Sequence, residues 1–160
     1  MSSTARTHSR YWLTLWIAVS LAVAVLIFCF SSQPASESGT ISRGMLRWLL
    51  SLVGYTPEQL PETLHHYLRK AAHFTIYALL GFCLRGAFDA QTRVPPLPCS
   101  IGAAALYAMS DEFHQSFVPG RGPQLSDVLL DTAGAALGVL MMTLLLHLLS
   151  LWRRRSKPLP

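Results

Sequence analysis

The sequence predicts an all-α integral membrane protein, a bundle of four transmembrane helices with a short interfacial helix after the first span. Composition is the first reason, because 51% of the 160 residues are hydrophobic and only 13% are charged, whereas a soluble domain carries about a quarter charged residues. Arrangement is the second reason, since long apolar runs alternate with short polar segments rich in proline and glycine.

Four apolar runs define the expected spans, at 11–30, 68–88, 97–113 and 127–152. The first run contains no charged residue, and as a helix it is about 30 Å long, which is the thickness of the hydrocarbon core. This run is longer than the apolar core of a secretory signal peptide, and no clear small-x-small cleavage site follows it. We therefore expect it to be a membrane anchor that is retained in the mature protein. The third run is the shortest and is rich in Ala, Gly and Ser.

Residues 41–53 are too few and too charged to span a membrane. Their apolar side chains recur at helical spacing, which indicates a helix that lies in the interface or packs on the bundle. The expected organisation is therefore one membrane domain over 11–152, between a short tail at 1–10 and a basic tail at 153–160.

The distribution of Lys and Arg predicts the orientation. Four spans place both termini on one side, and with the termini in the cytoplasm eight basic residues lie inside and five outside, which favours this orientation. The inside residues are Arg6, Arg10, Arg85, Arg93, Arg153, Arg154, Arg155 and Lys157. The outside residues are Arg43, Arg47, Arg69, Lys70 and Arg121. The chain has a net charge of +5, but its basic residues do not alternate with aromatic residues as they do on a nucleic-acid-binding surface. The charge therefore favours anionic lipid over nucleic acid as the partner.

A polar stripe runs along the second span. His66, Lys70, His73 and Tyr77 fall within an arc of about 60° on a helix of 3.6 residues per turn. A cation and two imidazoles on one stripe should face the bundle interior or water. Snorkelling to the interface explains His66 and Lys70 about as well, but it explains His73 less well because His73 lies one turn deeper.

Acidic residues gather at the end of the third span. Asp111 and Gln115 lie one turn apart, and Glu112 is next in the chain. Carboxylates at a helix C-terminus oppose the helix dipole and need basic partners. A solvated pair among the headgroups is the alternative, but we expect Asp111 or Glu112 to share a pocket with His73.

The fourth span begins with two further acids. Asp127 suits a helix start, where its carboxylate meets free N–H groups, and that role alone would explain it. Asp131 lies one turn deeper, on the stripe that continues through Gly134 and Gly138. A GxxxG-type stripe packs against another helix, so both aspartates should face inward.

The loop VPGRGP carries Arg121 between the third and fourth spans. Its guanidinium matches a carboxylate or phosphate bidentately, so we expect it to turn toward Asp111, Glu112 and Asp127. A solvated loop cation is the alternative. The candidate ligand-binding residues are Lys70, His73, Tyr77, Asp111, Glu112, Gln115, Arg121 and Asp127.

No motif indicates a cofactor or a resident metal. Cys29, Cys83 and Cys99 match no metal-binding spacing, and HExxH, a nucleophile elbow and a phosphate loop are all missing from the sequence. We therefore expect neither a cofactor nor a metal. A metal-dependent variant of an enzyme would use His73 with an acid as its ligands, namely Asp111, Glu112 or Asp127.

Three segments resemble the VanZ-like family of bacterial membrane proteins, and the resemblance covers roughly residues 11–150. They are FSSQ at 30–33, KAAHFTIYALLGFCL at 70–84 and SDEFHQSFVPGRGPQLSDVLLDTAGAALG at 110–138. The family pattern has Lys-x-x-His-Phe-x-x-Tyr, then Asp-Glu-x-x-Gln, an Arg, and an Asp before a glycine-bearing helix. Asp131 departs from it, since the family often has Asn there. The resemblance implies a multi-pass protein of the bacterial inner membrane and a link to teicoplanin-type glycopeptide resistance.

Three functions remain open at this stage. The first is a non-enzymatic envelope factor that binds a lipid-linked or glycopeptide-type ligand at the outer face, where Lys70 and Arg121 meet an anionic headgroup. The second is an intramembrane enzyme in which His73 acts as general acid or base beside Asp111 or Glu112. The third is a small transporter, which the gathering of polar residues on one side disfavours. We favour the first, with membrane lipid as a partner; the sequence leaves a homo-oligomer open.

Overall fold

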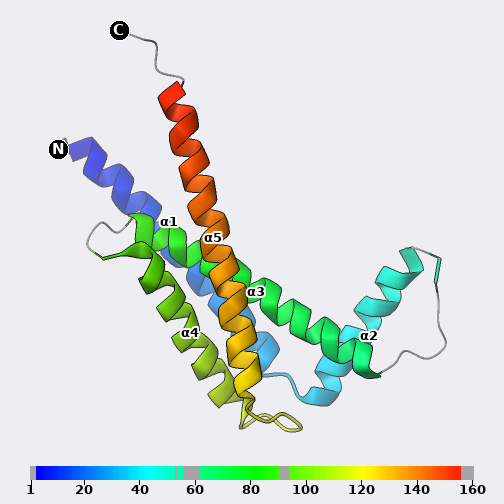
Figure 1. Ribbon diagram of the computed structural model, residues 1–160. Helices are drawn as coiled ribbons and strands as arrows, with labels where there is room; N and C mark the ends of the chain where they lie inside the picture. Colours follow the sequence, from blue (N-terminus) through cyan, green and yellow to red (C-terminus); the bar gives the residue numbers. More distant parts are fainter. Residues whose placement is uncertain (1–2, 53, 56–61, 91–93, 156–160) are drawn as a thin grey trace.

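The computed structural model describes residues 3–52, 54–55, 62–90 and 94–155, and in these residues it is all helical. The helices are α1 (Ser3–Ser31), α2 (Ala35–Leu52), α3 (Glu62–Ala90), α4 (Pro96–Gln115) and α5 (Leu125–Arg155). Figure 1 shows α1, α3, α4 and α5 gathered in one bundle, with α2 at the end of the molecule where α3 begins. The expected all-α architecture is therefore confirmed.

Three of these helices are long and apolar enough to cross a membrane, over Arg10–Ser31, His66–Ala90 and Leu125–Arg155. They coincide with the expected first, second and fourth spans. The expected third span corresponds to α4, whose 20 residues are about 30 Å long. Helix α4 is not among the three, because its polar C-terminal end SDEFHQ lowers its mean hydropathy. A crossing of the membrane by α4 therefore stays a prediction.

Helix α2, which corresponds to the predicted interfacial helix, begins earlier than the sequence predicted. It was expected over 41–53 and instead starts at Ala35, while residue 53 lies outside the described residues. Pro34 directly precedes the helix, and its carbonyl accepts a hydrogen bond from the Glu37 N–H at 3.1 Å. A fixed proline φ and an acidic residue in the first turn both favour a helix start, and the polar Ser36 and Glu37 are exposed there.

Helices α1 and α5 extend into both expected tails, because α1 starts at Ser3 and α5 runs to Arg155. Residues 1–2 and 156–160 lie outside the described residues, as does Arg93 of the basic count. The last turn of α5 contains three arginines. Cations are favoured there, because the C-terminal end of a helix carries the negative end of the helix dipole.

Glycine residues allow α3 and α5 to pack at very close range. A Cβ on Gly134 would meet the carbonyl of Phe74, and a Cβ on Gly138 would meet the carbonyl of Ala78. From the α3 side, a Cβ on Gly81 would meet the carbonyl of Ala135. The glycine stripe of α5 therefore faces another helix as expected, and this contact carries the neighbouring acid of α5 into the bundle.

The polar residues meet at one end of the bundle. Figure 1 shows the start of α1, the end of α3, the start of α4 and the end of α5 at one end of the bundle, whereas α1 and α4 end and α5 begins at the other. The α4–α5 loop turns at that second end through Gly120, whose φ of 75° suits glycine. We call this second end the site end.

Candidate functional site

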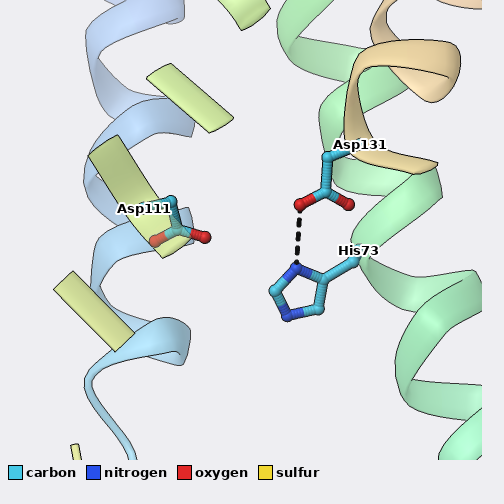
Figure 2. Close-up of side chains that lie close together, drawn as sticks. All are labelled: His73, Asp111 and Asp131. Atoms are coloured by element: carbon cyan, nitrogen blue, oxygen red, sulfur yellow. Dashed lines mark ion pairs between the residues drawn. The ribbon is translucent and has the colours of Figure 1, made fainter. Parts of the chain in front are cut away.

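Three helices bring an imidazole and two carboxylates together at the site end. His73 comes from α3, Asp111 from α4 and Asp131 from α5, and Figure 2 shows their side chains converging. One ligating atom of each lies within 4.8 Å of the other two. We call these three residues the acid–imidazole cluster. The sequence analysis expected His73 beside Asp111 or Glu112, and the acids that it meets are Asp111 and Asp131.

The acids of the cluster are almost completely withdrawn from solvent. Asp111 is 4% exposed and Asp131 is 0% exposed, whereas His73 is half-buried. The His73 Nδ1 atom lies 3.5 Å from Asp131 Oδ2, and neither Asp131 oxygen has a hydrogen-bond partner among the described residues. Burying an unpaired carboxylate is costly, so this arrangement needs a compensating group.

Asp111 is supported by two neutral donors. The Ser31 hydroxyl at the end of α1 donates to Asp111 Oδ2 at 2.9 Å. The Gln115 amide, one turn further along α4, donates to the same oxygen at 3.1 Å and lies 3.3 Å from the Ser31 hydroxyl. Both donors are buried, so they fix the orientation of this carboxylate.

Tyr77 lies one turn below His73 and is completely buried in the core with Ile27 and Ala108. Its hydroxyl has no hydrogen-bond partner among the described residues. It is close enough to both cluster carboxylates to interact with their charges. A buried tyrosine hydroxyl normally has a hydrogen-bond partner. The Tyr77 hydroxyl is therefore a free donor that a group bound at the cluster could use.

The remaining acids at the site end are engaged elsewhere. Lys70 Nζ donates to Asp127 Oδ1 at 2.6 Å, and both side chains are largely buried. Glu112 Oε2 accepts a hydrogen bond from the Gln124 backbone N–H at 2.8 Å. Glu112 therefore holds the α4–α5 loop, and neither it nor Asp127 joins the acid–imidazole cluster.

Arg121 turns inward from its loop but does not pair with the acids that we expected. Its Nη2 atom donates to the Phe30 carbonyl at 3.4 Å, and its Nε and Nη1 atoms are buried without a hydrogen-bond partner. Burial lowers the pKa of the Arg121 guanidinium and the charge of Arg69 acts the same way, while Asp111 and Glu112 act against both. The guanidinium is thus aimed at space that no carboxylate of the described chain fills.

That space is a cavity of about 250 Å³ between α1, α2, α3 and the α4–α5 loop. Its polar lining consists of Gln33, Arg69, His73 and Arg121. Its apolar lining consists of Ile27, Phe30, Met45, Leu68, Ala72 and Ile76. The cavity therefore joins two guanidinium groups and an imidazole to an apolar wall.

Four polar residues of the cluster, its supports and the cavity are missing from the candidate set predicted from the sequence. Ser31 and Gln33 belong to the FSSQ segment at 30–33, and its position after the first span could have indicated them. Asp131 shares the glycine stripe of α5, and that stripe already placed it inward. Arg69 entered the sequence analysis only through the count of basic residues, because it does not lie on the stripe of Lys70 and His73.

One comparison with known proteins covers most of the chain and all of the site. The family model described as VanZ/LLP1 matches residues 16–147. No curated protein and no solved structure matches the chain. The matched range contains the acid–imidazole cluster, Arg121 and the larger part of each of the three helices that are apolar enough to cross a membrane.

Proposed function

The chain belongs to the VanZ/LLP1 family, and from this premise we propose that it is a membrane factor of the bacterial cell envelope that binds an anionic, lipid-linked molecule. The ligand's headgroup would enter the cavity at the site end, and its apolar chain would follow the apolar wall. The binding event itself, without chemical turnover, is the proposed activity.

The observation that carries this proposal is the pair of guanidinium groups at one cavity. Arg69 and Arg121 both line it although their like charges oppose each other. Two nitrogen atoms of Arg121 are buried without an acceptor, and a guanidinium fork matches a phosphate or carboxylate bidentately. An anionic headgroup would supply the missing acceptors and relieve the repulsion.

The apolar wall supports a lipid-linked ligand over a free anion. Ile27, Leu68 and Ile76 come from two helices that are apolar enough to cross a membrane. Ligand sites are mostly apolar and hold a few convergent polar groups. The cavity has that character, and it lies where a lipid chain and its headgroup would both be accommodated.

The proposal includes an orientation in the membrane. The termini lie in the cytoplasm, α4 crosses the membrane as the third of four spans, and the site end faces the outer side of the inner membrane. The support comes from the excess of basic residues beside the termini and from the exposed Leu106, Met109 and Phe113 on α4, which would face lipid.

A link to glycopeptide resistance follows from the resemblance to VanZ-like proteins and is part of the proposal. In this proposal Lys70 and Asp127 position the loop that carries Arg121, and Arg121 contacts the headgroup.

The proposal is tested by binding of farnesyl diphosphate, with farnesol as the neutral ligand of the same chain, to the purified full chain in detergent. Arg121→Lys keeps the charge but loses the fork, and we expect about tenfold weaker binding, equivalent to one charge-assisted hydrogen bond. Arg121→Ala should lose more, and Arg47→Ala on the exposed face of α2 is the matched control. Equal binding of farnesol, or wild-type affinity in both Arg121 variants, would overturn the proposal.

An intramembrane enzyme is the second candidate, and one observation favours it. His73 lines the cavity and lies 3.5 Å from a buried carboxylate, which is an arrangement in which a carboxylate can orient an imidazole for general acid–base work. Release of inorganic phosphate from farnesyl diphosphate, abolished by His73→Gln, would establish turnover. Saturable binding without phosphate release would leave the binding factor as the function.

A further inference from the structure

We propose that His73, Asp111 and Asp131 form a site for one divalent metal ion of the zinc and manganese class, at the meeting point of α3, α4 and α5. The three residues offer one nitrogen and two carboxylate oxygens, the ligand types that such ions take. The proposal is independent of the anionic ligand, since it concerns the metal ion alone.

The charge of the cluster calls for a cation. Two carboxylates are at least 95% buried there, and a low-dielectric interior makes uncompensated charges costly. Lys70 is already bound to Asp127, and Arg121 donates to the carbonyl of Phe30. A divalent ion would neutralise both carboxylates and let His73 bind in its neutral form.

Asp131 supplies an independent indication that a ligand is missing. It is 0% exposed, and both of its oxygens lack a hydrogen-bond partner within the described chain. Figure 2 shows its carboxylate directed at the His73 ring. Buried polar groups in native proteins almost always have partners, so a carboxylate with two free oxygens aimed into a cluster indicates a bound ion.

The spacing of the atoms fits two ligands of one ion better than a hydrogen bond. The His73 Nδ1 to Asp131 Oδ2 distance of 3.5 Å is too long for a good N–H···O bond. Two ligands of a tetrahedral ion with bond lengths of about 2.1 Å are about 3.4 Å apart. The widest separation within the cluster, at most 4.8 Å, closes to this value by side-chain movements of about 1 Å.

The groups around the cluster resemble the outer shell of a metal site. Ser31 and Gln115 both donate to Asp111 Oδ2, and such donors orient a ligating carboxylate. The Tyr77 hydroxyl also lies near both acids and makes no hydrogen bond within the described residues. Three protein ligands leave a fourth position open, and because His73 lines the cavity, a water molecule or a substrate could occupy that position.

The test uses the full chain, purified in detergent without a histidine tag and stripped with a chelator. Titration with Zn²⁺ followed by elemental analysis should find one ion per chain, and Mn²⁺ should compete. Asp131→Asn keeps the shape but removes the charge, and we expect affinity for Zn²⁺ to fall at least tenfold. His147→Gln, which removes an exposed imidazole of α5, is the matched control and should bind like the wild type.

A spectroscopic measurement on the wild-type chain keeps the proposal testable if Asp131→Asn does not fold. Co²⁺ in a tetrahedral site gives intense visible bands, which Zn²⁺ should abolish stoichiometrically. Absence of a stoichiometric ion in the wild type, a Co²⁺ spectrum like that of the aqueous ion, or unchanged Zn²⁺ affinity in a folded Asp131→Asn variant would each overturn the metal site.

Discussion

Each acid at the site end has a different kind of partner, and the differences separate structure from function at the scale of single residues. Glu112 accepts a backbone N–H of the α4–α5 loop, and Asp127 accepts the ammonium of Lys70. Asp111 accepts two neutral side chains. Asp131 faces only an imidazole at 3.5 Å. The contacts of Glu112 and Asp127 are structural. Asp111 and Asp131 are the two acids to which the proposed metal ion would bind.

The Lys70–Asp127 pair gives a prediction about stability. Both side chains are largely buried, so Lys70→Met leaves a carboxylate without its cation and should lower the free energy of unfolding by about 1–3 kcal/mol. Asp127→Asn should cost a similar amount. The double variant should lower the free energy of unfolding by clearly less than the sum of the two single variants, because no buried charge is then left without its partner. Denaturation in detergent measures all four proteins of this cycle, and additive losses would show that the pair contributes nothing.

The sequence predicted which residues gather but not how they pair. The stripe of α3 correctly brought Lys70 and His73 to the same end as the acids. The partner of each depends on the rotation of α4 against α5, and helical periodicity does not contain that rotation. The sequence analysis therefore placed Glu112 among the acids that could lie beside His73, whereas in the structure Glu112 binds the α4–α5 loop and Asp131 lies beside His73.

At the scale of elements, the α3–α5 contact determines the position of the site. Gly134 and Gly138 remove the side chains that would separate the two helices, and Asp131 lies one turn before Gly134. The backbone of α5 therefore approaches α3 where His73 and Tyr77 are placed. A wider separation would move Asp131 away from His73.

A pair of glycine substitutions tests this contact. A Cβ on Gly138 would meet backbone atoms of Ala78 and Phe82, which cannot move without shifting α3, so Gly138→Ala should destabilise by about 1–3 kcal/mol or more. Gly102→Ala is the matched control on α4, because a Cβ there meets nothing within 4 Å. Its better helix propensity should stabilise by up to about 1 kcal/mol. Equal thermal stability of the two variants would contradict the close packing.

The positions of the helices were more predictable than their ends. The apolar runs located α1, α3 and α5, because a helix that can cross a membrane needs a long hydrophobic stretch, and the shorter run at 97–113 located α4. The helices extend past these runs, α3 from Glu62 to Ala90 instead of 68–88, since polar residues continue a helix wherever they reach water or headgroups. The early start of α2 has the same cause.

At the scale of the whole molecule, the question is how many times the chain crosses the membrane. The helices of the bundle alternate in direction, so both termini lie at the end opposite the site (Figure 1). Helix α4 buries small residues such as Ser100, Ala104 and Ala108 inside the bundle and exposes Leu106 and Phe113. An apolar outer face and a small inner face are what a membrane helix packed against its neighbours requires.

Reporter fusions at residues 94 and 120 and at the C-terminus distinguish four spans from three. If α4 crosses, positions 94 and 120 lie on opposite sides, and position 94 shares the cytoplasmic side with the C-terminus. If α4 does not cross, positions 94 and 120 share a side, and the C-terminus lies opposite to both. A comparison of position 120 with the C-terminus alone would not distinguish three spans from four, because α5 crosses between these two positions in both arrangements. We expect position 120 outside and the other two inside, since eight of the thirteen Lys and Arg residues then lie in the cytoplasm, and the cavity then opens toward the outer face.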